Sequence, residues 1–484
     1  MSRSRPFAAA PSRRSAGPGR TLAGLALSAT LALGPCLTPS VVQAQEGGGI
    51  NLIRDTEIEE TLHADSDPIF RAAGLVPKDV TLMLVGEKDL NAFTVNGQAI
   101  FVNTGLIVET ANPNQLEGVI AHETGHAAGG HSARSGDMEK AAMAPFLMTL
   151  GLGVLAAAAG APDAAIALIG SSQYFGVINM LTFSRAQEAA ADQAAITYMQ
   201  RSGKSARGLV DFFENFRYEE VFSEARRFKF FQSHPVSGER IELLRRRAEE
   251  QSHYNDVDTA EDQARHDVMK AKLFAFMNPP QQTFIKYTEK DTSYPARYAR
   301  AIAYYKALET DHAIRDIDAL IADYPTNPYL YELKGQVWFE VGKSALAEKA
   351  HARSVELKPG APLLRINLAQ AIIAQGDEKR TDEAIAHLQK ALSVEGDNAF
   401  AWRLMSQAYD AKGEAGAARL AAAEERFAVG DMTQARIFAL RARQLLTRDT
   451  PQWRRATDIV LVSNPSKDDL RMMAGQTGLA NLPH

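Results

Sequence analysis

The chain has almost no cysteine, because Cys36 is the single one among 484 residues. That residue lies in an N-terminal stretch that we expect to be removed. The mature chain would then have no disulfide and no metal site built from thiolates. Any metal ion must be bound by histidine, aspartate and glutamate. An oxidising compartment is permitted but not required.

Acidic residues are also missing at the start of the chain, where none precedes Glu46. The same stretch carries five arginines, then the apolar run "TLAGLALSATLALG" and a small-residue end, "VVQA". This order predicts a secretory signal peptide over residues 1–44, cleaved after Ala44. A membrane anchor fits less well, because the apolar run is shorter than the roughly 20 residues that a span needs. A lipid-bearing Cys36 is disfavoured because Pro35 precedes it.

An excess of positive charge is absent beyond that leader. The five leader arginines leave 48 of the 53 basic residues against 58 acidic ones, so the remaining chain carries a net charge near −10. Such a chain repels the phosphate backbone, which argues against nucleic acid as a partner.

Charge is missing altogether from two neighbouring runs. Residues 141–162 and 164–184 contain no charged side chain, and only Asp163 separates them. Their lengths permit two membrane spans. Proline, glycine and polar residues interrupt both runs, however, and favour helices that pack around the site or contact a membrane surface or an apolar client.

The first part of the chain combines helix and strand signals. The stretch "LIRDTEIEETLHADSDPIFRAAGL" has apolar residues at helical spacing and ends before Pro77, and "VTLMLVGE" reads as a strand. Asn96-Gly97 lies between two β-rich runs and predicts a hairpin. We expect its second strand, within "QAIFVNTGL", to offer an edge to which an extended substrate adds.

The second half of the chain is repetitive. Pro325 and Pro359 are 34 residues apart, and the same offset pairs Pro328 with Pro362 and Ala313 with Ala347. Three extra residues, placed in "GDEKRT", keep the later matches in register. A period of 34 resembles the tetratricopeptide repeat, whose helical pairs stack into a concave surface for peptides or proteins. An ordinary helical bundle does not explain the fixed offset.

The strongest chemical motif is "HETGH" at residues 122–126. Histidines four apart on a helix project from one face, so His122 and His126 can bind one ion. Zinc suits two imidazoles and a carboxylate, and it acidifies a bound water. Glu123 is then placed as the general base that takes the proton and returns it to the leaving amine. The alternative is a surface helix with solvated histidines, but the preceding apolar "LEGVIA" indicates a buried helix.

A metal ion on two histidines needs a third ligand, and the sequence offers two candidates. His131 is one, although the longer HExxHxxGxxH motif would place its histidine at Ser132. The better candidate is Glu188 in "SRAQEAAAD", where the alanines Ala189 to Ala191 would let two helices approach closely. Asp192, one turn later, faces the same way and can accept the free ring N–H of a ligating histidine.

These motifs together resemble a known family. HETGH, ExxAD at residues 188–192 and "SHPVSGERI" at residues 233–241 occur in the order found in the M48 zinc metallopeptidases, and the C-terminal repeats resemble its periplasmic, repeat-bearing members. The resemblance implies a gluzincin-type site, with one zinc ion on His122, His126 and Glu188, and Glu123 as the base.

The resemblance also places the His234-Pro235 pair close to the metal. His234 would then either bind the oxyanion of the tetrahedral intermediate or act as a fourth ligand that keeps the enzyme latent. Arg240 would orient this loop through a carboxylate. Without the resemblance, His234 reads as an exposed loop residue held extended by the proline.

The implied function is a periplasmic zinc endopeptidase that degrades stalled outer-membrane proteins and aids their assembly. Its partners would be unfolded or partly assembled outer-membrane proteins and the barrel-assembly machinery, with membrane-surface contact through residues 141–184. The alternative is a chaperone or assembly scaffold whose protease site is latent.

The expected architecture is an α+β zincin-like metalloprotease domain followed by an all-α tetratricopeptide-repeat superhelix. We place the protease domain at residues 45–255 and a linker with a lead-in helix at residues 256–290. The repeats follow at residues 291–462, and a C-terminal tail at residues 463–484.

Overall fold

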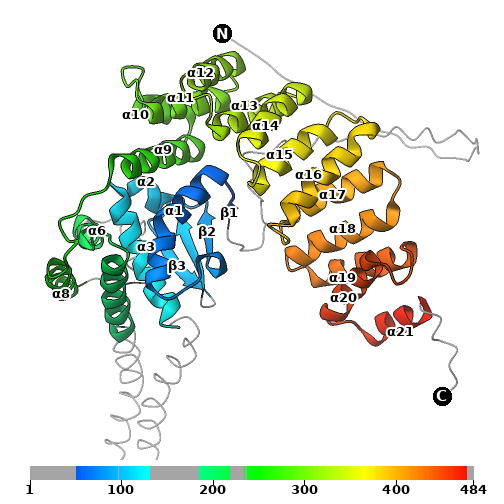
Figure 1. Ribbon diagram of the computed structural model, residues 1–484, viewed down its shortest axis with the longest axis horizontal. Coiled ribbons are helices and arrows are strands. Elements are labelled where there is room, and N and C mark those ends of the chain that lie inside the picture. Colours follow the sequence, from blue (N-terminus) through cyan, green and yellow to red (C-terminus); the bar gives the residue numbers. More distant parts are fainter. Residues whose placement is uncertain (1–50, 96–97, 131–184, 218–233, 235–236, 477–484) are drawn as a thin grey trace, which may run out of the picture. The chain divides into compact units, whose positions relative to one another are not determined.

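The computed structural model describes residues 51–95, 98–130, 185–217, 234 and 237–476 (Figure 1). The predicted signal peptide, the two uncharged runs and the ligand candidate His131 all lie outside these residues. Within them, no helix is both long enough and apolar enough to cross a membrane.

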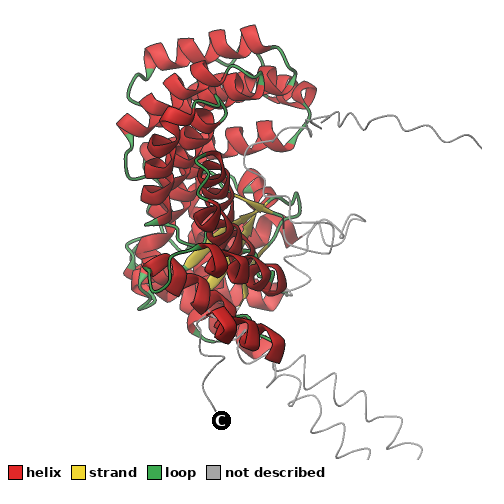
Figure 2. Cartoon of the chain, turned by 90° about the vertical axis from the view of Figure 1, so that its right-hand side faces the viewer, coloured by secondary structure: helices red, strands yellow, loops and turns green. Residues whose placement is uncertain are grey.

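A small four-stranded sheet organises the first part of the chain (Figure 2). Its strands are β1 (Leu52–Ile53), β2 (Thr81–Val85), β3 (Ala92–Val95) and β4 (Ala99–Asn103), in the order β1-β2-β4-β3. β2 and β4 run parallel, whereas β1–β2 and β3–β4 are antiparallel. The expected strand is confirmed as β2, and the expected hairpin strands are confirmed as β3 and β4, which pair antiparallel. The Asn96-Gly97 pair between them lies outside the described residues.

The prediction that the second hairpin strand offers an edge is wrong. β4 pairs with β2 on one side and with β3 on the other, so its hydrogen-bonding groups are already used. Among the described strands, β3 is the one at the edge next to the metal-motif helix. The alternating sequence predicts the strand but not its position in the sheet, which depends on the long-range pairing with β2.

The helix that carries HETGH is α3 (Pro113–Ala128), and it packs against β3, β4 and α1 (Thr56–Ala72). Asn112 caps its first turn by accepting a hydrogen bond from the Gln115 N–H at 2.9 Å, and Pro113 occupies the first helical position, where its missing N–H costs nothing. Almost every residue of α3 is buried, as its apolar first half predicted.

The first part of the chain contains further helices. The remaining elements of this part are η1 (Pro77–Asp79), α2 (Thr104–Glu109), a helix over residues 185–201, α6 (Arg207–Arg217) and α8 (Gly238–Glu249).

Two glycines of α3 permit close approach of the neighbouring helices. A Cβ on Gly118 would lie 2.8 Å from the Leu209 backbone nitrogen in α6, and one on Gly125 would lie 2.9 Å from the Ala191 carbonyl oxygen. The second contact brings the 185–201 helix against the metal-motif helix. Only Ala191 of the expected alanine run lies at this contact, because Ala189 and Ala190 are exposed.

The second half of the chain is helical. Its helices are α9 (Ala260–Met277), α10 (Pro280–Lys286), α11 (Tyr294–Lys306), α12 (Thr310–Asp323), α13 (Pro328–Glu340), α14 (Ser344–Leu357), α15 (Pro362–Ile373), α16 (Thr381–Leu392), α17 (Ala399–Ala411), α18 (Ala415–Ala428), α19 (Met432–Leu445), α20 (Pro451–Val462) and α21 (Lys467–Gln476). Consecutive helices from α11 to α20 pack against each other (Figure 1).

The helix boundaries follow the 34-residue period. Helices α11, α13 and α15 begin at residues 294, 328 and 362, and α12 and α14 begin at 310 and 344. A short 3-10 helix, η3 (Glu378–Arg380), is three residues long and lies inside "GDEKRT", where the insertion was expected. The periodic spacing is therefore confirmed as a spacing of helices.

The matched glycines explain the turns within this array. Gly342, Gly376 and Gly413 have φ between 68° and 75°, the left-handed region in which other residues are strained. Leu308 occupies the equivalent position of the first helical pair with φ 63°, and its side chain is 84% exposed. Among these four matched positions, the one occupied by Leu308 is therefore strained, and the three glycines are relaxed.

The expected boundaries differ from the packing at two places. α9 is more than a lead-in, because Met269 and Leu273 enter the core of the first part while Ala271 and Ala275 enter the core formed with α11–α13. Residues 467–476, expected as a tail, form α21, which contacts α19 through the Arg436–Asp469 ion pair at 3.0 Å.

Candidate metal centre

His122 and His126 project from the same face of α3. Their Nε2 atoms lie 3.1 Å apart, and both side chains are buried. The helical spacing of four residues accounts for this, since each turn of helix returns the next ligand to the same direction.

The helix over residues 185–201 supplies two carboxylates to this face. Glu188 Oε2 lies 3.4 Å from His122 Nε2, and Glu188 Oε1 lies 3.4 Å from His126 Nε2. Asp192, one turn later, lies 3.0 Å from the other ring nitrogen of His122, Nδ1. Asp192 thus contacts the side of the His122 ring that faces away from Glu188.

His234 reaches the cluster from the segment before α8. Its Nδ1 lies 3.3 Å from His122 Nε2 and 3.0 Å from Glu188 Oε1, and its Nε2 lies 3.3 Å from Glu123 Oε1. The side chain is buried. The structure thus places His234 inside the cluster and not on the surface.

These four side chains have the geometry that a single ion requires. His122, His126, Glu188 and His234 each offer one ligand atom, and all of these atoms lie within 4.8 Å of one another. A tetrahedron of ligands bound to zinc at about 2.0–2.1 Å separates its corners by roughly 3.4 Å. The contacts of 3.0 to 3.4 Å match that separation. Imidazole and carboxylate ligands also suit zinc, so the donor set fits the ion.

The charges around the cluster favour a cation. Burial alone would lower the pKa of His122, but its hydrogen bonds to Asp192 and Glu188 outweigh this and raise the pKa to about 9. Burial would raise the pKa of Glu188, yet hydrogen bonds to His122, His126 and His234 bring it well below the ordinary value. The carboxylates thus stay ionised and attract positive charge to the ring nitrogens.

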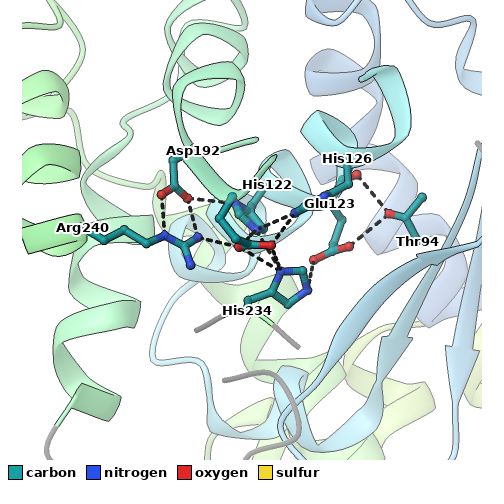
Figure 3. Close-up of polar contacts among 8 residues, drawn as sticks. Thr94, His122, Glu123, His126, Asp192, His234 and Arg240 are labelled. Carbon is teal, nitrogen blue, oxygen red and sulfur yellow. Dashed lines mark hydrogen bonds and ion pairs between the residues drawn. The ribbon is translucent and has the colours of Figure 1, made fainter. Parts of the chain in front are cut away.

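Arg240 ties the two carboxylates together from the first turn of α8. Its Nε and Nη2 donate to Asp192 Oδ2 at 2.6 Å and Oδ1 at 2.8 Å, and Nη2 also lies 3.0 Å from Glu188 Oε2 (Figure 3). The guanidinium stacks over Phe213 at 5.0 Å from the ring centre. The structure thus shows that the carboxylate partner expected for Arg240 is in fact a pair.

Glu123 lies beside the cluster with its two carboxylate oxygens in different surroundings. Oε1 faces His234, as described above, while Oε2 lies 3.0 Å from the Thr94 hydroxyl on β3. The same hydroxyl lies 3.0 Å from the Glu123 carbonyl oxygen. Thr94 was not singled out from the sequence, where it is one residue of an alternating strand. Its spacing of two residues from buried Ala92 indicates that Thr94 shares the face of the strand toward α3. This spacing does not indicate the distance from Thr94 to Glu123.

The region that carries the cluster is similar to known proteins. Residues 54–248 match peptidase family M48. A beta-barrel assembly-enhancing protease of Yersinia pestis is 24% identical over 79% of this chain and 79% of that protein. A protein of the same name from Escherichia coli K12 is 24% identical over 75% of this chain and 74% of its own length.

A third relative is similar over a shorter stretch of the chain. The metalloprotease LoiP of Escherichia coli K12 is 34% identical over 33% of this chain and 59% of its own length. Every residue described around the cluster, from Thr94 to Arg240, lies within the matched residues 54–248.

Proposed function

We propose that this chain, a zinc metalloendopeptidase whose residues 54–248 form a peptidase M48 domain, acts on outer-membrane proteins in the periplasm. It would degrade those that are misassembled or stalled and aid the assembly of others. Two kinds of observation support this: the buried cluster that can hold one ion, and the relatives named as beta-barrel assembly-enhancing proteases across most of the chain.

The metal ligands in this proposal are His122, His126 and Glu188. The contact of Asp192 with His122 Nδ1 supports a role in fixing the ring, because accepting that N–H leaves the Nε2 lone pair free for the ion. Arg240 in turn holds Asp192 and Glu188 in one arrangement.

His122, His126 and Glu188 would hold the zinc ion, which would act as a Lewis acid toward a peptide carbonyl and lower the pKa of a nearby water. Glu123 accepts the proton of that water as it attacks, and then delivers the proton to the leaving amine. The buried position of Glu123 next to the cluster supports this role, since it excludes bulk water from the carboxylate.

His234 keeps the site latent in this proposal. Its Nδ1 completes the tetrahedral set, and its Nε2 faces the oxygen of Glu123 that would receive the proton. A residue in this position excludes the water that Glu123 must activate. Movement of His234 out of the cluster would then open the site for a client.

The helical array would bind clients or partners. The 34-residue spacing of its helices supports a tetratricopeptide-repeat superhelix, an architecture that presents an extended binding surface. The two uncharged runs, residues 141–184, would contact the membrane surface or an apolar client.

The latency proposal is tested by His234→Ala, with zinc content and circular dichroism as controls. We expect zinc to be retained and cleavage of an unfolded outer-membrane β-barrel protein to rise. If His234 instead stabilises the oxyanion, zinc is retained and turnover falls, by roughly 100-fold or more for a donor of this kind.

The second candidate function is an assembly factor whose protease site is rarely used. The position of His234 among the ligand atoms favours it, because His234 Nδ1 would take the fourth position around an ion held by His122, His126 and Glu188. Glu123→Gln separates the two functions, since only proteolysis needs the base. A variant that still promotes assembly of an outer-membrane protein in cells but no longer degrades stalled copies supports both activities in one chain. Loss of degradation with loss of assembly indicates that assembly depends on cleavage.

A further inference from the structure

Thr94 offers one hydroxyl proton to two acceptors on the same residue. Its Oγ1 lies 3.0 Å from Glu123 Oε2 and 3.0 Å from the Glu123 main-chain oxygen (Figure 3). A hydroxyl has a single proton to donate, so it serves one of these acceptors fully at a time. Both acceptors belong to the residue placed above as the base.

The sheet fixes the position from which Thr94 donates. Antiparallel pairing sets Thr94 opposite Ile100 of β4, which is fully buried. Phe93 lies on the opposite face of β3, where its ring stacks on Phe101 with centres 5.0 Å apart. Because Phe93 holds one face and the pairing holds the register, the Thr94 side chain has one direction left, toward α3.

We propose that Thr94 is a positioning residue for the general base, holding Glu123 Oε2 so that Oε1 faces the metal cluster. The proposal rests on the role of Glu123 given above. Oε1 lies 3.3 Å from His234 Nε2, on the side of the ligand atoms, whereas Oε2 is turned to β3. A carboxylate attached by one oxygen keeps the other aimed, and a rotation about the terminal bond of Glu123 would break this contact.

The second acceptor gives the hydroxyl an alternative partner. A hydrogen bond to a carboxylate is stronger than one to a neutral carbonyl, so Oε2 is the better acceptor of the two. The hydroxyl can also donate to the Glu123 carbonyl oxygen at the same distance, so it keeps a partner if the Glu123 side chain moves.

A purely structural role for Thr94 predicts different effects when the hydroxyl is removed. If the hydroxyl only fastens β3 to α3 through the Glu123 carbonyl, its loss lowers stability and disturbs the ligand histidines on the same helix. If it positions the base, its loss leaves zinc binding and substrate binding intact and reduces the chemical step. Stability, zinc content, KM and kcat therefore separate the two roles.

Thr94→Val is the informative variant because it removes the hydroxyl, keeps the branched shape and suits a strand. We expect kcat for an unfolded outer-membrane β-barrel protein to fall roughly 10- to 100-fold, the scale of a displaced catalytic group. KM and zinc content should not change, and thermal stability should fall by no more than in a variant that loses one comparable hydroxyl elsewhere. Thr94→Ser, which restores the hydroxyl, should recover most of kcat.

Thr104→Val is the matched control. It removes a buried hydroxyl that donates to the Glu87 carbonyl at 2.9 Å, away from the cluster, so it should lower stability and leave kcat unchanged. A readout without turnover is the affinity for a hydroxamate, which shares a proton with the base. Thr94→Val should weaken hydroxamate binding, and Thr94→Ser should restore it.

Two results would overturn the proposal while leaving the proposed function intact. One is wild-type kcat in Thr94→Val when Glu123→Gln is inactive. The other is a fall in activity that follows zinc loss or early unfolding and is not recovered by Thr94→Ser. Full activity in Glu123→Gln would instead remove the base itself, and the proposed mechanism with it.

Discussion

Two buried histidines in this molecule have pKa values that are shifted in opposite directions. Burial would lower the pKa of His122, but Asp192 and Glu188 raise it to about 9. Burial alone acts on His351 of α14 and lowers its pKa to about 4. The same side chain thus lies beside two carboxylates in the protease part, whereas in the helical array burial is the cause of its shifted pKa.

The difference shows what each region is built to do. In the metal centre, the ring nitrogens can bind a cation, and the surrounding carboxylates offset the desolvation energy of burying its charge. In the array, His351 fills space: a Cβ on Gly335 would lie only 2.5 Å from its ring. A buried histidine therefore indicates a metal site only when ionised partners accompany it.

The largest effect that separates the regions is expected from Glu123→Gln. Loss of the base should lower peptide-bond hydrolysis by about 100- to 10,000-fold while zinc is retained, because the ligand set is untouched. His351→Phe is the matched control in the array and should keep wild-type turnover. The rate of degradation of an unfolded β-barrel protein checks both variants. Comparable activity in Glu123→Gln and wild type would mean that another group activates the water.

A smaller effect is expected from Asp192→Asn. The amide keeps the shape of the side chain but removes the charge that His122 and Arg240 share, so zinc affinity should fall about 10- to 100-fold. Competition with a chromogenic chelator measures this. Asp211→Asn, at a solvent-accessible ion pair 3.4 Å from Arg207, serves as the control and should bind zinc like the wild type. Equal affinity in both variants would show that Asp192 does not support the ligand.

The stability of the helical array should depend on pH through the neutral side chain of His351. The pKa of His351 is lowered in the folded state to about 4, so the unfolded chain takes up the proton first as the pH falls. The stability contributed by neutral His351 is complete above the unfolded pKa of about 6.5 and is lost as the pH falls toward 4, by about 3 kcal/mol in total. His351→Phe should flatten this part of the stability curve of the array, measured by urea unfolding between pH 7 and pH 5. An unchanged slope would place the titration elsewhere.

The smallest effect concerns the strained turn. Leu308→Gly should stabilise the array by about 1 kcal/mol, because a left-handed conformation costs a leucine roughly that amount and costs glycine nothing. Gly342→Leu, at the equivalent relaxed turn, should destabilise by a similar amount. Thermal unfolding of both variants tests the pair. A lower melting temperature for Leu308→Gly would show that the exposed leucine makes a stabilising contact.

Features that depend on nearby residues could be predicted from the sequence. His122 and His126 share a helix, β3 and β4 are adjacent in sequence and pair with each other, and the helix period of 34 recurs locally. Features that depend on distant segments were harder. The central position of β4 follows from its pairing with β2, and the shared role of α9 follows from packing on two cores.

The metal centre shows the same division. The helical spacing suggested Glu188 and Asp192 as partners of the histidines, and the structure brings both to His122. The contacts of Arg240 with two carboxylates and of Thr94 with Glu123 join segments more than 25 residues apart in the sequence. No local pattern encodes such distances. The carboxylate partner of Arg240 was therefore expected only from the family resemblance, and the contact of Thr94 with Glu123 was not expected at all.

We propose that the buried cluster of His122, His126 and Glu188 holds one zinc ion per chain. Elemental mass spectrometry of the purified protein tests it directly, with Glu188→Gln and Glu123→Gln measured alongside. We predict about one zinc per chain in the wild type and in Glu123→Gln, and a large loss in Glu188→Gln, which removes a ligand oxygen. Equal zinc in the wild type and Glu188→Gln would contradict the account.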